Sequence, residues 1–382
     1  MSEVTGIRQA AGNLLVVGLS GTELTALERA WLKLVRPAGV ILFRRNIVDA
    51  EQTRALLNEA TGLGARHAVR CVDVEGGTVN RLRDALSPIA SAQAVAAAMR
   101  TAKKPVLARK HGELIARAVK IFGFNTTLAP VVDLTLPEAT EVLGSRTTGA
   151  TPADVIAYAR EFLAGVATQG IVGCGKHFPG LGGASGDTHF VTPAIERNWD
   201  QIWNEDVVPY RELHRAMPMI MTNHAAYPRT PGKNEPASAS QFWITGTLRK
   251  KIGYKGVILS DDLEMGGILK FLPVDEAAVA AVRAGSDLVE ICHSAELILR
   301  SYEALISEGE RSAAFRRVLL AAARVSVRKR ARLYAGGLPP ALNMKRLASL
   351  RSEIAQFNET IAKILKAAED ASPRAASPAE AS

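Results

Sequence analysis

Eight short apolar runs, separated by segments with helical periodicity, constrain the fold of this 382-residue chain more than any other feature. The runs lie at residues 13–20, 39–46, 68–77, 126–134, 170–180, 218–225, 256–265 and 286–294. Segments between them, such as 25–35, 50–60, 152–168 and 274–284, carry apolar residues at i, i+3 and i+4. Strands that alternate with helices are joined by parallel crossovers, so the pattern predicts an α/β protein with a single closed (β/α)8 TIM-type barrel. An open doubly wound sheet is the alternative.

The sequence changes character after the glycine and proline residues at 336–340. We expect a barrel domain over residues 1–335, a C-terminal accessory helical extension over 336–371, and a disordered tail over 372–382. The tail consists mainly of Ala, Ser and Pro, which bury too little apolar area to offset the entropy of ordering a chain.

Composition and charge argue against a membrane protein, a secreted protein and a nucleic-acid-binding protein. No run approaches eighteen apolar residues, and the first residues lack the basic and then apolar pattern of a secretory signal, so we expect a cytoplasmic protein with no membrane partner. The formal net charge is +9, but much of it lies in segment 316–332, where Arg alternates with Ala, Leu and Val. We interpret this segment as the solvated face of an amphipathic helix and expect no nucleic-acid partner; an anionic partner is the alternative.

The three cysteines, Cys71, Cys174 and Cys292, lie far apart in apolar runs. This pattern indicates buried free thiols rather than disulfides or a metal site. The chain also lacks a His-x-His pair after its first predicted strand and a Gly-x-Gly-x-x-Gly motif that opens a helix. We therefore expect neither a metal nor another cofactor.

Polar residues cluster where the predicted strands end. Active sites of (β/α)8 barrels lie at the carboxyl ends of the strands. Core packing explains why the runs themselves are apolar, but it does not explain why charged residues gather at only one end of them. The residues at these ends are Asp73, Glu75, Asp133, Lys176, His177, Asn223, His224, Asp261, Asp262 and His293.

The most informative segment begins with Lys176-His177, continues through a glycine-rich stretch and reaches Asp187 and His189. Side chains at i and i+2 of an extended segment point the same way, so Asp187 can orient the imidazole of His189 for proton transfer. The glycines permit a loop that moves towards a substrate. A surface turn, with Lys176 and His177 in a buried salt bridge, is the alternative interpretation.

Asp261 emerges after the apolar run that begins at Gly256. A carboxylate that faces an acid/base group is what cleavage of a glycosidic bond requires. His189, with an ordinary pKa of about 6.5, suits the proton-transfer role at neutral pH. We assign the chemistry to Asp261 and a helix N-cap to Asp262. His67, His111 and His214 lie in or beside helical segments and are interpreted as structural.

Several motifs together resemble one family, the cytoplasmic β-N-acetylglucosaminidases of glycoside hydrolase family 3. The resemblance covers roughly residues 10 to 335. The chain departs from the family pattern at Leu181, where histidine is typical, at Thr188, where serine is typical, and at Val74, where a polar residue is more usual. The motifs are Lys176-His177-Phe178-Pro179-Gly180, Asp187-Thr188-His189, Ser260-Asp261-Asp262-Leu263, Asp73-x-Glu75-Gly76-Gly77 with Arg81, Ala129-Pro130-Val131-Val132-Asp133, and Met221-Thr222-x-His224 with Tyr227-Pro228.

The resemblance implies a retaining enzyme that removes a terminal N-acetylglucosamine during recycling of cell-wall muropeptides. It implies that Asp261 is the nucleophile, His189 the acid/base and Asp187 its partner. It further implies that the substrate-binding residues are Asp73, Arg81, Arg146, Lys176 and His177. We expect a monomer. A family 3 β-glucosidase, an N-acetylglucosaminide phosphorylase and a non-catalytic sugar-binding barrel are the alternatives.

Overall fold

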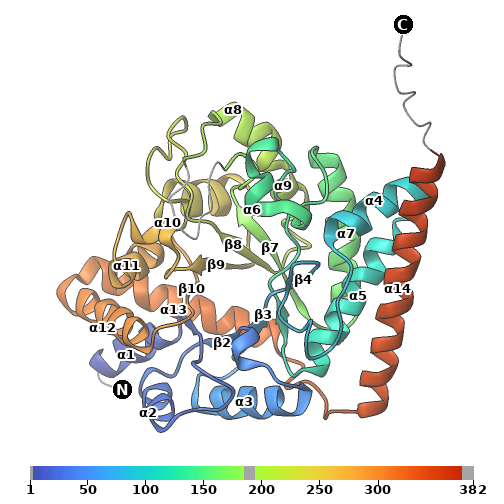
Figure 1. Ribbon diagram of the computed structural model, residues 1–382. Helices are drawn as coiled ribbons and strands as arrows, with labels where there is room; N and C mark the ends of the chain where they lie inside the picture. Colours follow the sequence, from blue (N-terminus) through green and yellow to red (C-terminus); the bar gives the residue numbers. More distant parts are fainter. Residues whose placement is uncertain (1–2, 185–193, 372–382) are drawn as a thin grey trace, which may run out of the picture.

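The computed structural model describes residues 3–184 and 194–371, and its centre is a closed barrel of eight parallel strands (Figure 1). Each of the eight predicted runs contains one barrel strand, and the last strand pairs with the first, so the predicted barrel is confirmed and the open sheet is excluded. The strands in barrel order are β1 (Leu15–Val17), β2 (Gly39–Leu42), β3 (Val69–Val72), β6 (Thr126–Thr127), β7 (Val172–Phe178), β8 (Met219–Thr222), β9 (Val257–Asp262) and β10 (Leu288–Ile291).

Helices surround the barrel, and local sequence sets where several of them begin. Thr25 forms a capping box with Glu28, and the hydroxyl of Thr151 accepts a hydrogen bond from the amide of Asp154. The outer helices are α1 (Glu3–Gly12), α2 (Ala26–Val35), α3 (Ala50–Leu63), α4 (Ala92–Ala102), α5 (Val106–Ile121), α7 (Pro152–Ala167), α9 (Val208–Leu213), α11 (Val274–Ala284), α12 (Ala295–Arg311) and α13 (Ala313–Leu333).

Shorter elements lie in the connections between strands and helices. They include an antiparallel hairpin, β4 (Val74–Gly76) with β5 (Val79–Asn80), which follows β3 directly. The other short elements are η1 (Arg44–Asn46), η2 (Pro137–Ala139), α6 (Thr140–Leu143), η3 (Gly144–Arg146), α8 (Trp199–Gln201), the π-helix η4 (Ile202–Asp206), η5 (Ala237–Ala239), the π-helix η6 (Phe242–Lys251) and α10 (Gly266–Leu269).

The barrel interior is a separate apolar cluster from the layer between strands and helices. Interior side chains such as Ile41, Leu128 and Leu259 are almost completely buried. All three cysteines lie in this interior as free thiols, which confirms their predicted state. The interior layer closes the barrel below the carboxyl ends of its strands.

The predicted basic helix over 316–332 is confirmed as part of α13, but Arg330 is not on its solvated face. The Arg330 guanidinium is buried and donates to the carbonyl of Arg66 and the side chain of Asn13. Burial lowers its pKa to about 10. Helical periodicity could not reveal this position, because carbonyls at the amino-terminal end of the barrel supply the acceptors.

The expected C-terminal accessory segment forms the long helix α14 (Met344–Ala371), which packs along α4 and α5 (Figure 1). Leu350 and Ile354 are fully buried, and Arg117 of α5 makes two hydrogen bonds to Glu353. The proposed boundaries of the three regions stay predictions, and the tail over 372–382 lies outside the described residues. Among the helices described, none is long and apolar enough to cross a membrane.

The packing of α14 predicts that Leu350→Ala lowers the free energy of unfolding by about 2–5 kcal/mol, because the substitution leaves a cavity against the barrel. Gln356→Ala, on the exposed face of the same helix, is the control and should change stability by less than about 0.5 kcal/mol. Urea denaturation followed by circular dichroism measures both. Equal stability of the two variants would show that α14 contributes no packing energy to the barrel.

Candidate active site

A pocket of about 190 Å³ opens at the carboxyl ends of the barrel strands. Six of the eight site residues predicted from the sequence line it: Asp73, Arg81, Arg146, Lys176, His177 and Asp261. The other two, Asp187 and His189, lie outside the described residues. The structure therefore brings together the predicted sugar-binding residues and the predicted nucleophile, which come from four parts of the sequence.

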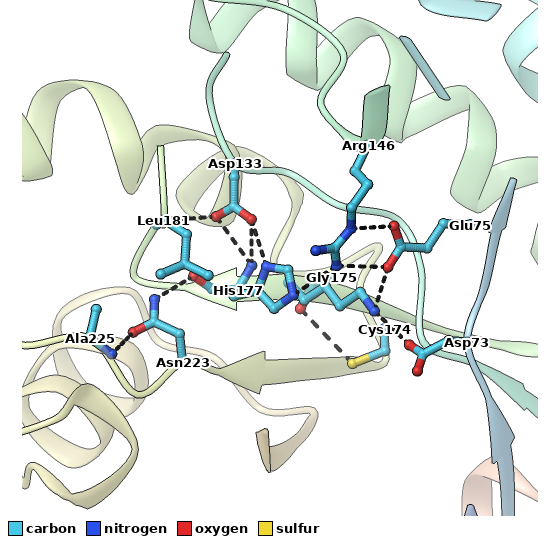
Figure 2. A network of polar contacts seen from close by, with 12 residues as sticks. Asp73, Glu75, Asp133, Arg146, Cys174, Gly175, His177, Leu181, Asn223 and Ala225 are labelled. Atoms are coloured by element: carbon cyan, nitrogen blue, oxygen red, sulfur yellow. Dashed lines mark hydrogen bonds and ion pairs between the residues drawn. The ribbon is translucent and has the colours of Figure 1, made fainter. Parts of the chain in front are cut away.

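A network of charges (Figure 2) includes three residues that line the pocket, Asp73, Arg146 and Lys176. The Lys176 ammonium lies 2.7 Å from a carboxylate oxygen of Asp73 and 2.6 Å from one of Glu75. Arg146 binds both oxygens of Glu75, each at 2.9 Å. The network contains two cations and two anions, so burial leaves no net charge uncompensated within it.

The oppositely charged members of this network stabilise each other in their ionised forms. Burial opposes ionisation of Glu75, but Arg146 and Lys176 outweigh it and lower the pKa of Glu75 to about 2. The same balance lowers the pKa of Asp73 and raises the pKa of Lys176. The alternative interpretation of Lys176, a buried salt bridge, is thus also correct, since the ammonium both pairs with carboxylates and faces the pocket.

A third carboxylate, that of Asp133, holds His177. The Nδ1 atom of His177 lies 2.7 Å from Asp133, and Nε2 lies 3.3 Å from Arg146 (Figure 2). Asp133 also accepts a hydrogen bond of 2.8 Å from the backbone amide of Leu181. The leucine side chain is buried and lines the pocket. Asp133 therefore fixes both the imidazole and the start of the glycine-rich segment.

Asp261 lies at the end of β9 and lines the pocket, and it makes no ion pair within the described residues. One of its oxygens accepts a hydrogen bond of 2.9 Å from the amide of Asp262. The predicted N-cap role of Asp262 is wrong, because α10 begins only at Gly266 and its preceding residue is Met265. Asp262 instead accepts from the amide of Glu264 and stabilises the turn after the strand.

The sequence reasoning missed Glu290, a buried acid on the pocket floor. Within the described residues, the only hydrogen bond of its carboxylate comes from the Cys71 thiol, at 3.6 Å. Burial raises the pKa of Glu290 well above its ordinary value, and Asp261 and Asp73 raise it further. The available signal was an acid with two apolar residues on each side, in Leu288-Val289-Glu290-Ile291-Cys292.

Glu264, which follows β9, was also missed. Its carboxylate accepts hydrogen bonds from the backbone amides of Cys292 and Ser294, at 2.8 and 2.9 Å, and from that of His293. It thereby holds the loop after β10, whose His293 lies on the pocket rim beside Phe43 with ring centroids 5.2 Å apart. No regular pattern predicts such a contact between neighbouring loops.

The remaining histidines are placed mainly as the sequence suggested. His111 is buried and contacts the Tyr158 hydroxyl at 2.8 Å, and burial lowers its pKa to about 3, which confirms a structural role. His224 is buried beside Ser238 rather than exposed at the pocket mouth. Over residues 3–184 and 194–371, no group of three or more His, Cys, Asp or Glu side chains is arranged to hold a metal ion.

Residues 7–326 match the model of the glycosyl hydrolase family 3 N terminal domain. The chain belongs to glycosyl hydrolase family 3. A relative named Beta-hexosaminidase from Idiomarina loihiensis is 34% identical over 279 residues, covering 73% of this chain and 83% of its own length. Another of that name from Chromobacterium violaceum is 36% identical over 285 residues, covering 74% and 79%. The prediction of a family 3 glycoside hydrolase is confirmed.

Solved structures of family 3 members share the fold. A β-N-acetylglucosaminidase from Paenibacillus sp. str. FPU-7 is 28% identical with a TM-score of 0.81, covering 92% of this chain and 68% of its own. NagZ from Neisseria gonorrhoeae, in complex with N-trifluoroacetyl-D-glucosamine, is 27% identical with a TM-score of 0.69, covering 82% and 98%. The fold is thus that of a family 3 barrel.

The environment of Glu290 predicts a pH-dependent stability difference between wild type and Glu290→Gln. Because the folded-state pKa lies above the unfolded value, the folded protein binds an extra proton at pH values above about 4.5. The wild type should therefore lose stability relative to the variant by up to about 1.4 kcal/mol per pH unit as pH rises from 5 until Glu290 ionises. Urea denaturation at a series of pH values measures this, and a constant difference would contradict the assignment.

Proposed function

We propose that this protein is a retaining exo-β-N-acetylglucosaminidase that acts in the cytoplasm on cell-wall muropeptide fragments. The main support is the arrangement of one free carboxylate, Asp261, in the same pocket as the paired charges around Lys176. The names of the family 3 relatives support the sugar, since they are β-hexosaminidases and N-acetylglucosaminidases. The muropeptide and the cytoplasmic location rest on the sequence resemblance.

The paired charges suit recognition of a sugar rather than catalysis. Asp73, Lys176 and Arg146 are fixed by their mutual ion pairs, so their remaining donors and acceptors can meet sugar hydroxyls without first being ordered. Charge-assisted hydrogen bonds of this kind are about twice as strong as neutral ones. His177, oriented by Asp133, and Arg81 would add further donors along the same wall.

The chemical steps assign one role to each group. Asp261 attacks the anomeric carbon while His189, oriented by Asp187, protonates the departing oxygen, and a covalent glycosyl-enzyme forms. His189 then takes a proton from water, and the resulting hydroxide attacks the same carbon and breaks its bond to Asp261. The sugar is released, His189 regains the proton that it gave to the leaving oxygen, and two successive inversions retain the β configuration. Because Asp187 and His189 lie outside the described residues, their roles are supported by the sequence motif alone.

A substrate panel tests the overall proposal. We expect faster hydrolysis of p-nitrophenyl β-N-acetylglucosaminide than of the β-glucoside, and β-N-acetylglucosamine as the first product by NMR. Equal rates on both sugars would favour a β-glucosidase, and an α anomer as first product would exclude a retaining mechanism. Added inorganic phosphate should not yield a sugar phosphate; if it does, the enzyme is a phosphorylase.

His189→Ala should lower the rate by about 10²- to 10⁴-fold on substrates with poor leaving groups, and much less on activated phenols. The reason is that an activated phenol leaves without a proton. Rates measured with alkyl and dinitrophenyl N-acetylglucosaminides give the comparison. Equal losses on both substrates would remove His189 from the acid role.

Asp261→Ala should nearly abolish turnover with little change in stability, because the carboxylate makes no ion pair within the described residues. Asp84→Ala is the matched control, since Asp84 is a surface aspartate with a side chain 63% exposed. Steady-state rates and thermal unfolding of both variants provide the test. A fully active Asp261→Ala protein would place the nucleophile elsewhere.

A further inference from the structure

The two segments that border residues 185–193 are both fixed to the barrel. On the entering side, the Tyr227 hydroxyl donates to the carbonyl of Gly180 at 2.7 Å, and Asp133 holds the amide of Leu181. On the leaving side, the amide of Ile195 donates to the carbonyl of Ala226 at 2.9 Å. These contacts define where the segment that carries Asp187 and His189 begins and ends.

One ion pair, between the half-buried Arg197 and the buried Asp206, contacts both bordering segments; we refer to it as the loop-base pair. The Nε atom of Arg197 donates to Asp206 at 2.8 Å, and the guanidinium also pairs with Glu205. Asp206 belongs to the π-helix η4 and is only 2% exposed. π-Helical turns are frequent at functional sites.

The loop-base pair packs against two glycines of the entering segment. A Cβ atom added to Gly180 would lie 2.8 Å from the Cβ of Asp206, and one added to Gly183 would lie 2.8 Å from the Cδ of Arg197. Arg197 itself belongs to the leaving segment, since it follows Ile195 by two residues. The ion pair therefore joins the two ends of the segment at close contact, with no space for larger side chains.

The charge of Asp206 depends on pH near neutrality. Burial and, to a smaller extent, the neighbouring charge of Asp133 raise its pKa to about 7 against the opposing effect of Arg197. Tyr210 and Tyr227 also face it, as the influence of Asp206 on their own pKa values indicates. Its second oxygen, Oδ1, has no hydrogen-bond partner within the described residues. Ionisation of this one group thus forms or removes the charged pair.

We propose that Arg197 and Asp206 are positioning residues for proton transfer, fixing the ends of the segment that carries the acid/base His189. This inference rests on the proposed function of His189. Neither residue lines the sugar pocket, so their contribution acts through the placement of that segment and not through substrate contact. Misplacement of a catalytic group by about 1 Å costs as much as 10²-fold in rate, which sets the size of the expected effect.

Asp206→Asn tests the proposal because it keeps the shape of the side chain and removes its charge. We expect kcat/KM on an alkyl N-acetylglucosaminide to fall by about 10- to 10²-fold at pH 8, and by less than about 3-fold on the dinitrophenyl substrate. The ratio of wild-type to variant rates on the alkyl substrate should rise between pH 6 and 8, as Asp206 of the wild type ionises.

Asp287→Asn is the matched control. Asp287 is also buried and paired with an arginine, Arg249, but it lies before β10 at the opposite end of the barrel. Asp287→Asn should change the stability of the protein, and any loss of rate should be the same on the alkyl and dinitrophenyl substrates. If Asp206→Asn fails to fold, Arg197→Lys, which keeps the charge but loses the paired donors, provides the same comparison.

Equal losses on the two substrates, or a rate ratio that does not change with pH, would overturn the proposal and leave the loop-base pair a purely structural contact. His189→Ala measured in parallel separates this outcome from failure of the proposed function. If the rate loss of His189→Ala depends on the leaving group and that of Asp206→Asn does not, only the present inference is wrong. If neither variant shows the dependence, the acid/base assignment itself is wrong.

Discussion

The site depends on the neutralisation of one buried ammonium group, that of Lys176, by Asp73 and Glu75. Removing one partner of such a buried pair costs about 3–5 kcal/mol, since the remaining charge is left without compensation. The three residues come from β7 and from the end of β3 with its hairpin, and Arg146 adds a fourth charge from the connection before α7. One interaction therefore fixes the relative positions of three separate parts of the chain (Figure 2).

In the proposed function, this network binds the sugar and a separate carboxylate performs the chemistry. Its positive and negative charges are matched on one wall, whereas Asp261 lies apart from them at the end of β9 and its carboxylate contacts only a backbone amide among the hydrogen bonds of the described residues. Glu290, on the floor between them, holds its proton more tightly than an ordinary glutamate. An anionic group that faces the substrate without a cationic partner is free to form a bond to carbon.

Sequence periodicity predicted the barrel because each strand is buried on both faces and each helix on one, which leaves a clear pattern in the residues. It also predicted that Asp73, Lys176 and Asp261 lie at the mouth, since strand ends can be located from the runs, whereas Arg81 and Arg146 were implied by the family resemblance and Glu290 was missed. Pairings between strands were not predictable: the bonds from Arg146 to Glu75 and from His177 to Asp133 depend on three-dimensional register. Asp262 was misassigned for a local reason, because the helix after β9 begins three residues later than the polar residues suggested.

The claim that Asp261 is the attacking carboxylate is tested most directly by trapping the covalent intermediate. A slow substrate, a fluorinated N-acetylglucosaminide with an activated leaving group, should add one sugar mass to the protein, and peptide mass spectrometry should locate it on Asp261. Protein in which Asp261 is replaced by Ala should remain unlabelled. Label on any other side chain, or no covalent adduct despite turnover of the same substrate, would contradict this account of the site.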